Sequence, residues 1–375
     1  MFTDRTDLQK EKIAIIAVKR PKEEIDVEEL KGLVEALGGE VVQTVIQKRR
    51  AFSPSTYIGK GKTAEIDTEN ATLIVAYHPL SYSQKRNLEE LTGLPVIDRT
   101  EVILEIFARR ARTKEAKLQV ELAKAYYQLS HLRGKGKELS RLGGGVGTRG
   151  PGETKTEVEA RAIRRKIYKL REELEEVIKR QELIRKGRKK KNFKTVAIVG
   201  YTNVGKSTLV KALTRKDVFI KDIPFATLDV KTGSLYLDGE TVLISDTVGF
   251  IRNLPHELIA SFRATLSEVK EADLLLIVFD VSSEKLEEEL RSVEQVLKKL
   301  KSWDKPKIFV ANKIDKVIDS YERSEELYQL IAGKLPETDS PVVFISAKKG
   351  WGLDKLKEEI KKAIKLVSSA PAQGS

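Results

Sequence analysis

One short stretch of the chain combines glycine, lysine and serine at a spacing that suits phosphate binding. Gly200 is followed by Gly205, Lys206 and Ser207, which matches the pattern G-x-x-x-x-G-K-[ST]. The glycines let backbone N–H groups approach phosphate oxygens, Lys206 can reach the β- and γ-phosphates, and the Ser207 hydroxyl can bind Mg²⁺. The expected phosphate-binding residues are Gly200, Asn203, Val204, Gly205, Lys206, Ser207 and Thr208.

An aspartate and a glycine further along the chain suit the other side of a triphosphate. Asp246 begins the run Asp-Thr-Val-Gly, so its carboxylate can hold Mg²⁺ and the N–H of Gly249 can face the γ-phosphate. Thr227 is our candidate for a mobile threonine that binds Mg²⁺ only beside a γ-phosphate. Thr232 is a second possibility, although it begins an expected strand. The predicted metal ligands are Ser207, Thr227 and Asp246, and the predicted catalytic residues are Lys206, Gly249 and Thr227.

Two later runs suit recognition of a guanine base. Asp315 closes the pattern N-K-x-D, and its carboxylate can accept two N–H bonds that guanine offers and adenine cannot supply. The stem of Lys313 would lie along the base, and a backbone N–H of the Ser-Ala-Lys run at 346–348 can donate to the guanine O6. Alone, N-K-x-D could be a surface turn, but the ordered set predicts a GTPase fold that binds GTP or GDP with Mg²⁺. The expected nucleotide-binding residues in these two runs are Asn312, Lys313, Asp315, Ser346, Ala347 and Lys348.

The residue after Gly249 departs from a common arrangement. Many GTPases place a glutamine there to orient the attacking water, whereas this chain has Phe250. A phenyl ring cannot orient water, so hydrolysis must depend on backbone groups, the ion, Lys206 or a residue supplied by a partner. We therefore expect slow intrinsic hydrolysis.

Strands and helices must position these residues, and the hydrophobic pattern of the sequence predicts where those strands and helices lie. Apolar runs predict strands at 195–199, 232–237, 241–245, 274–280, 307–311 and 342–345, with helices from Thr208 and over 353–366. Asp238 and Gly239 predict a hairpin between the second and third of these strands. We assign residues 193–367 to an α/β domain of the Ras-like type and 368–375 to a disordered tail.

The first part of the chain predicts a separate, small parallel α/β domain at residues 1–98. Strands are expected at 12–18, 41–47, 72–77 and 95–97, and helices at 26–37, with Asp26 as N-cap, and at 81–91. Strands that alternate with helices are typical of a parallel sheet.

Residues 99–192 predict a basic helical hairpin. One helix is expected from near Asp98 toward Leu132 and a second over 156–184, both with heptad spacing, and a run at 185–191 is expected to be a linker. The intervening Gly-rich loop, from Gly143 to Gly152, would form the tip. Residues 109–194 carry 27 lysines and arginines against 11 glutamates, whereas the rest of the chain is nearly neutral. Such localised charge favours a nucleic-acid partner over an ordinary solvated surface.

Composition excludes several other classes of protein. The 375 residues include no cysteine and three scattered histidines, which argues against disulfides, thiolate chemistry and a histidine metal cluster. No apolar run is long enough to span a bilayer, and the first ten residues lack a signal-peptide core. We expect a monomeric, cytoplasmic protein without a membrane partner.

Several motifs together resemble the HflX family of translation GTPases. These motifs are DTVGFIRNLPH at 246–256, FATLD at 225–229, GGGVGTRGPGET at 143–154 and TYIGKGK at 56–62. The resemblance covers nearly the whole chain. It implies GTP hydrolysis with Mg²⁺, a hydrophobic residue at Phe250, binding to the large ribosomal subunit and its rRNA, and ribosome-stimulated hydrolysis. In bacterial members it also implies splitting of stalled ribosomes. Many of those members carry a further domain after the last G-domain helix, so binding is expected here and splitting is left open.

Three alternatives remain beside this interpretation. The stretch Gly-Lys-Gly-Lys at 59–62 could be a second phosphate loop, but it lacks the Gly-Lys-Ser/Thr ending, so we favour a turn or an RNA contact. A GTP-gated adaptor that binds a protein through its helical hairpin is a rival function, which the localised charge disfavours. A metabolic enzyme built on the first domain has no catalytic constellation to support it.

Overall fold

The computed structural model describes residues 8, 10–142, 155–190, 193–214, 231–247, 249, 267–336 and 339–369. Contacts within the chain define two compact units, Met1–Glu176 and Val177–Ser375. Among the residues that the structure describes, no helix is both long and apolar enough to cross a membrane.

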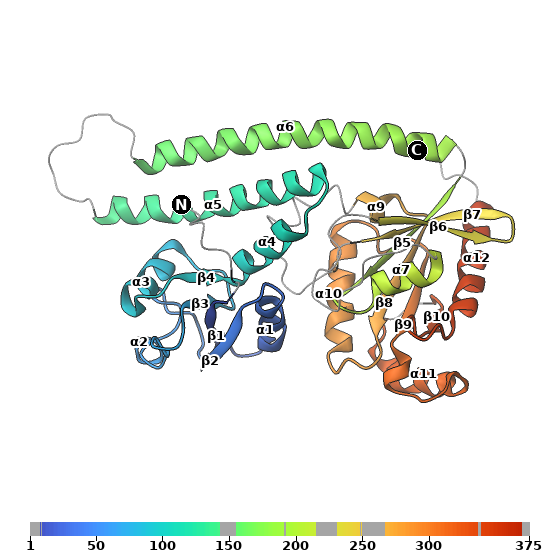
Figure 1. The fold of residues 1–375 in the computed structure, drawn as a ribbon, viewed down its shortest axis with the longest axis horizontal. Helices are drawn as coiled ribbons and strands as arrows, with labels where there is room; N and C mark the ends of the chain where they lie inside the picture. Colours follow the sequence, from blue (N-terminus) through green and yellow to red (C-terminus); the bar gives the residue numbers. More distant parts are fainter. Residues whose placement is uncertain are drawn as a thin grey trace. The chain divides into compact units, whose positions relative to one another are not determined.

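A four-stranded parallel sheet with the strand order β2-β1-β3-β4 forms the centre of the first unit (Figure 1). The prediction of a small parallel α/β domain is therefore confirmed, because all four expected strands are present with ends that differ by at most one residue. They are β1 (Lys12–Lys19), β2 (Glu40–Lys48), β3 (Leu73–Ala76) and β4 (Val96–Asp98).

Polar caps define the helices that pack beside this sheet. Helix α1 (Val27–Glu35) begins where the Asp26 side chain accepts a hydrogen bond from Glu29 N, as the sequence predicted. Helix α3 (Tyr82–Thr92) begins with a reciprocal capping box between Ser81 and Gln84. The stretch at 59–62, for which we favoured a turn or an RNA contact, contributes its last three residues to a one-turn helix, α2 (Lys60–Thr63), with Gly59 as the N-cap.

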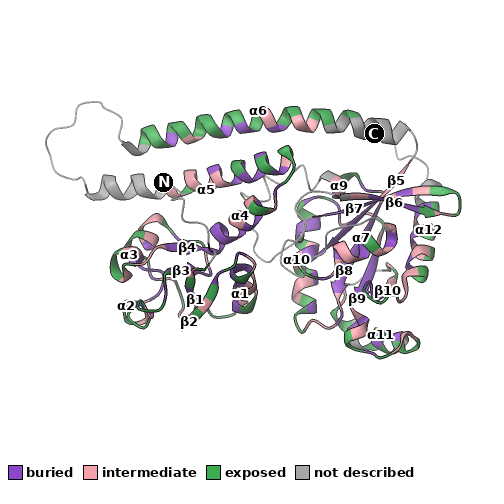
Figure 2. Ribbon diagram, viewed as in Figure 1, coloured by how far each residue is buried: buried purple, intermediate pink, exposed green. Residues whose placement is uncertain are grey.

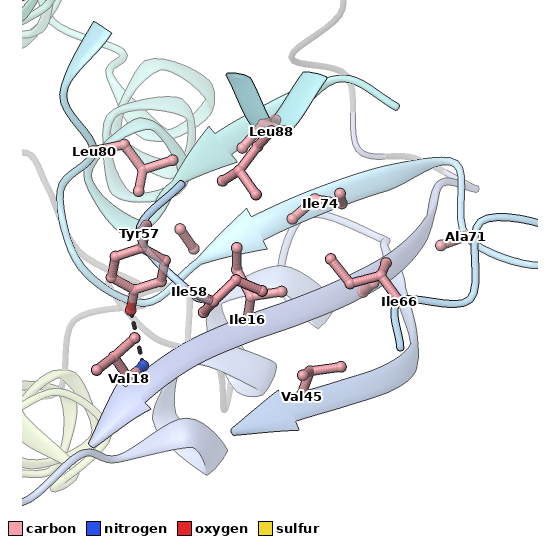
Figure 3. Packing of buried hydrophobic residues seen from close by; sticks show 13 residues of the cluster. Ile16, Val18, Val45, Tyr57, Ile58, Ile66, Ala71, Ile74, Leu80 and Leu88 are labelled. Carbon is pink, nitrogen blue, oxygen red and sulfur yellow. Dashed lines mark hydrogen bonds between the residues drawn. The ribbon is translucent and has the colours of Figure 1, made fainter. Parts of the chain in front are cut away.

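Apolar side chains from β1, β2 and β3 and the segments beside them form a buried cluster in this unit (Figure 3). Ile16, Val45 and Ile74 point into it, and the phenol of Tyr57 is fully buried among them. The Tyr57 hydroxyl accepts a hydrogen bond from Val18 N at 3.1 Å and lies 2.6 Å from Nδ1 of His78. Burial raises the pKa of Tyr57 and lowers that of His78, so both side chains are neutral at pH 7.

Three helices follow the sheet. They are α4 (Arg99–Arg110), α5 (Lys114–Leu142) and α6 (Lys155–Lys190), and α5 and α6 run side by side in opposite directions (Figure 1). The expected single helix from Asp98 to Leu132 is wrong. Ala111 has an extended backbone, and the Thr113 hydroxyl accepts a bond from Ala116 N, so a new helix begins there.

Several of the heptad positions on α5 and α6 are buried, and others, such as Leu129 and Ile163, are half-buried. Leu118 and Leu122 on α5 and Ile167 and Leu170 on α6 are all less than 9% exposed, while the intervening positions of α6 face solvent (Figure 2). The expected linker at 185–191 is corrected, because residues up to Lys190 continue α6. Arginine and lysine are strong helix formers, and their charge alone gave no reason to end the helix.

A buried hydrogen-bond network joins α5 to the end of the sheet. The Tyr127 hydroxyl lies 2.9 Å from Asp98 Oδ2 and 3.0 Å from Glu101 Oε1. Asp98 also ends β4 and caps α4 by accepting bonds from Thr100 N and Glu101 N. Burial raises the pKa of Glu101, with Lys85 at 2.9 Å acting in the opposite direction. The Asp98 carboxylate thus connects β4, α4 and α5.

The second unit contains a six-stranded sheet with the order β10-β9-β8-β5-β7-β6, in which only the edge strand β6 is antiparallel (Figure 1). The strands are β5 (Lys194–Gly200), β6 (Lys231–Leu237), β7 (Glu240–Asp246), β8 (Leu274–Asp280), β9 (Lys307–Asn312) and β10 (Val342–Phe344). Each expected strand is present, and β6 and β7 form the hairpin predicted at Asp238.

Helices and short 3₁₀ turns accompany these strands. The α-helices are α7 (Lys206–Thr214), α9 (Ser267–Glu271), α10 (Leu286–Lys299), α11 (Glu326–Ile331) and α12 (Leu353–Ser369). The 3₁₀ turns are η1 (Ile314–Lys316), η2 (Tyr321–Glu325) and η3 (Ala332–Lys334). Helix α7 begins two residues before the predicted start, and α12 extends into the expected tail, of which residues 370–375 lie outside the described residues.

Candidate guanine-nucleotide site

The motif residues gather at one edge of the six-stranded sheet. The phosphate loop follows β5, Asp246 ends β7, Asn312 ends β9, and the Ser-Ala-Lys run follows β10. These four strands are parallel, so their carboxyl ends share one edge, which is where open α/β sheets bind ligands.

Close packing explains the two glycines of the phosphate loop. Gly205 has φ +93, and a Cβ there would lie 2.4 Å from Nδ2 of Asn312. A Cβ on Gly200 would lie 2.2 Å from the carbonyl oxygen of Val278 on the neighbouring strand β8. Any larger residue would push the loop away from β8 and β9.

Lys206 lies buried inside the loop. Its ammonium donates hydrogen bonds to the carbonyl oxygens of Gly200 at 3.1 Å and Tyr201 at 2.5 Å. Burial lowers the pKa of Lys206 to about 8, Asp246 acts in the opposite direction, and Lys313 lowers it further. A buried ammonium with a depressed pKa is prepared to gain a strong anionic partner.

A serine and an aspartate form a pair of oxygen ligands beside this lysine. The Ser207 hydroxyl donates to Asp246 Oδ2 at 2.8 Å, and Asp246 is fully buried. The adjacent Thr247 hydroxyl donates to the carbonyl oxygen of Ile198 at 2.7 Å, which ties the end of β7 to β5. Gly249 is close enough to Lys206 that a Cβ there would lie 3.1 Å from its Nζ.

Asn312 connects three parts of the site. Its Nδ2 donates to the carbonyl oxygen of Val204 in the phosphate loop at 2.8 Å, and its Oδ1 accepts from Ala347 N at 3.0 Å. The side chain is 2% exposed, so both bonds are shielded from water. The sequence assigned Asn312 to nucleotide binding, and the structure shows that its side chain joins the phosphate loop to the turn after β10.

Lys313 and Asp315 follow at the same edge. The Lys313 ammonium donates to the carbonyl oxygen of Asn203 at 2.6 Å and pairs with Asp280 at 2.8 Å. Asp315 lies in η1 with its side chain partly exposed, so its carboxylate remains accessible. Asp280 was missed by sequence analysis. Its position as the last residue of an apolar strand at the carboxyl edge was the available signal.

In the turn after β10, two backbone N–H groups already donate hydrogen bonds within the protein. Ser346 N donates to the carbonyl oxygen of Trp351 at 3.1 Å, and Ala347 N is taken by Asn312. Within the described residues, the backbone N–H of Lys348 has no hydrogen-bond partner.

Several predicted residues lie outside the described residues. These are Thr227, Phe250 and the tip loop from Gly143 to Gly152. Of the second candidate threonine, Thr232, the structure shows that it lies within β6, 3.5 Å from the Ser245 hydroxyl. Thr208 lies in the first turn of α7, next to Ser207.

Sequence models of known families match three consecutive segments. They are described as "GTP-binding GTPase N-terminal" at residues 24–108, "GTP-binding GTPase Middle Region" at 110–188 and "50S ribosome-binding GTPase" at 195–313.

Individual relatives extend over most of the chain. A GTPase HflX from Caldanaerobacter subterraneus is 45% identical over 95% of this chain and 81% of its own length. A GTPase HflX from Escherichia coli is 40% identical over 94% of this chain and 82% of its own length. The crystal structure of a GTP-binding protein from Sulfolobus solfataricus in complex with GDP is 29% identical over 95% of this chain and 99% of that one, with a TM-score of 0.47.

The phosphate loop, the aspartate after β7 and the N-K-x-D turn on this sheet define a P-loop GTPase. Its two N-terminal segments match family models of their own. The chain belongs to the HflX family of GTPases. The resemblance inferred from the motifs is therefore confirmed, and guanine-nucleotide binding and GTP hydrolysis are activities of this family.

Proposed function

We propose that GTP binds at the carboxyl edge of the six-stranded sheet with its phosphates in the loop from Gly200 to Thr208. The observation that carries this proposal is the bridge by Asn312, which joins the phosphate loop to the turn expected to hold the base. The first N–H groups of α7 and the Lys206 ammonium would bind the phosphates. Lys206 would then exchange its bonds to two carbonyl oxygens for bonds to phosphate.

Mg²⁺ fits the oxygen pair of Ser207 and Asp246. Both side chains offer the hard oxygen ligands that this ion prefers, and they lie within hydrogen-bond distance of each other. Thr227 is the proposed third ligand from the chain. When bound, the ion would stabilise the negative charge on the phosphates.

Guanine specificity is assigned to Asp315, with the stem of Lys313 along the base. Because Ser346 N and Ala347 N already donate within the protein, we assign the hydrogen bond to guanine O6 to Lys348 N. Ser346 and Ala347 would hold the turn that presents this N–H.

Hydrolysis would rest on charge stabilisation by Lys206 and on the N–H of Gly249, with Thr227 closing over the γ-phosphate. Since Phe250 cannot orient water, we expect a slow basal rate and stimulation by a partner.

A titration with fluorescent nucleotides tests this assignment. Wild-type protein should bind GTP and GDP and should reject ATP. Lys206→Ala should lose nucleotide binding, whereas Lys211→Ala, on the same helix outside the loop, should retain it. Equal affinity for ATP and GTP would refute the assignment of the base site.

We propose further that the chain associates with the large ribosomal subunit through its helical hairpin. The family model described as 50S ribosome-binding supports the ribosome as partner, and the excess positive charge at 109–194 supports the hairpin as the contact with rRNA. In this proposal residues 1–98, 99–192 and 193–367 act as three functional modules, with the loop from Gly143 to Gly152 entering a cavity in the RNA.

Co-sedimentation with purified subunits at increasing salt tests this contact. Binding to large subunits should fall steeply with salt, and reversal of exposed hairpin charges at Arg161, Arg164 and Arg165 should reduce it. Reversal of Lys298 and Lys299 on α10 serves as the control and should have a smaller effect. Salt-independent binding would favour a protein contact instead.

A further inference from the structure

A largely shielded carboxylate outside the sequence motifs lies next to the proposed base site. Asp280 is the last residue of β8, the strand between β5 and β9. The six residues before it are apolar and buried, and the Asp280 side chain is only 14% exposed. An ionised group at such a position is costly unless it has partners.

Both carboxylate oxygens of Asp280 have partners. Oδ1 accepts hydrogen bonds from Ser282 N at 3.0 Å and from the Ser282 hydroxyl at 2.6 Å. Oδ2 lies 2.8 Å from Nζ of Lys313. Burial would raise the pKa of Asp280, but the hydrogen bonds from Lys313 and Ser282 outweigh it and lower the pKa, so the carboxylate is charged at pH 7.

The same ammonium reaches the phosphate loop. Lys313 Nζ donates to the carbonyl oxygen of Asn203 at 2.6 Å, and Lys313 has a left-handed backbone with φ 63 where β9 ends. A lysine side chain has a long flexible stem, so holding its ammonium in one place needs a fixed partner. Ser282 fixes Asp280, and Asp280 fixes Lys313.

We propose that Asp280 is a positioning residue of the guanine-nucleotide site, which holds Lys313 against Asn203 so that the lysine stem is in place before the base arrives. This inference rests on the proposed function. A site arranged in advance loses less entropy when the ligand binds. Asp280 also balances the charge of Lys313, which otherwise adds to that of the buried Lys206.

Nucleotide dissociation measures this role directly. Asp280→Asn keeps the shape and the acceptor for Ser282 but loses the charge, so GDP and GTP should both dissociate about tenfold faster, the effect of losing one partly shielded charged hydrogen bond. KM should rise by a similar factor while kcat stays within about twofold, because Asp280 does not touch the γ-phosphate. Asp280→Glu should recover part of the loss. Ser282→Ala removes one of the two bonds that hold Asp280 Oδ1 but leaves the pair with Lys313, so it should accelerate dissociation less than Asp280→Asn does.

A double-mutant cycle separates positioning from a general structural effect. In a Lys313→Ala background, Asp280→Asn should add little, because the ammonium that it positions is gone. The proposal is overturned if Asp280→Asn matches wild type in dissociation rate, or if it accelerates dissociation equally in both backgrounds. Wild-type protein that binds no guanine nucleotide would contradict the proposed function instead. The melting temperature of each nucleotide-free variant checks that the fold is retained.

Discussion

Asn312→Ala tests whether the hydrogen bonds that join the phosphate loop to the turn after β10 contribute to nucleotide binding. The substitution removes both hydrogen bonds of a side chain that is 2% exposed, and it leaves the carbonyl of Val204 and the N–H of Ala347 without that partner. Each buried polar group left in this way costs about 1–3 kcal/mol. Because the deleted side chain leaves room for water beside Gly205, we take the lower part of the range, about 2–4 kcal/mol for the two groups.

Part of this free energy can lower the stability of the fold and part can weaken nucleotide binding. We therefore propose to measure both the Kd for GDP and the free energy of unfolding. If all of it opposes nucleotide binding, the Kd for GDP rises about 30-fold to 1,000-fold. Any part of the roughly 2–4 kcal/mol that the change in Kd does not account for should appear as a lower free energy of unfolding of the nucleotide-free second unit in urea. Asn87→Ala removes an amide bond to the carbonyl oxygen of Ser55 in the first unit, at a more exposed position, and should leave the Kd unchanged. A Kd within threefold of wild type, together with unchanged unfolding, would refute the bridge.

Four other changes probe the remaining parts of the site. Asp315→Asn should weaken GTP by about 2–5 kcal/mol and favour xanthosine triphosphate; unchanged GTP affinity would contradict the base assignment. Phe250→Ala should reduce basal hydrolysis much less than the hundredfold or more that is typical for loss of an electrostatic contributor; inactivity equal to that of Lys206→Ala, with binding retained, would reveal a role for the ring. GTP affinity should fall as pH rises above about 8, by up to about tenfold per unit, because the empty site must then take up a proton on Lys206; a flat profile from pH 7 to 9, equal to that of Lys206→Arg, would contradict this. A Gly-Ser linker in place of residues 143–152 should spare GTP binding and basal hydrolysis but lower ribosomal stimulation; loss of basal hydrolysis would place the tip at the G domain.

The sequence predicts the strands and the motif positions well because each motif directly follows an apolar run. Gly205, Lys206 and Asp246 could be placed in this way, since parallel strands end at one edge of a sheet. The pairing of Asp280 with Lys313 could not be predicted, because it depends on which strands are neighbours and on their register.

Boundaries within the helical region were harder to predict for a local reason. Thr113 is a good N-cap residue, but the apolar pattern continues on both sides of it, so the pattern suggested one helix. The run at 185–190 has the opposite problem. Its charges suggested a linker. Arginine and lysine have high intrinsic helix propensities, however, and the run continues α6. For Asn312, the motif indicated a nucleotide contact but not its two bonds to the protein.

The hydrogen bonds of Tyr127 hold α5 to the first unit at a point well before the end of the helix. This residue is fixed to Asp98 and Glu101 at the end of the first sheet, and α5 continues from it to Leu142. At 1.5 Å per residue, that outer part is about 22 Å long. A tilt of about 10° at Tyr127 would therefore move the end of the helix by about 4 Å, which is comparable to the width of a side chain. The bonds of the Tyr127 hydroxyl, together with the ion pair between Lys124 and Glu105, thus help to set the direction of the outer part of α5.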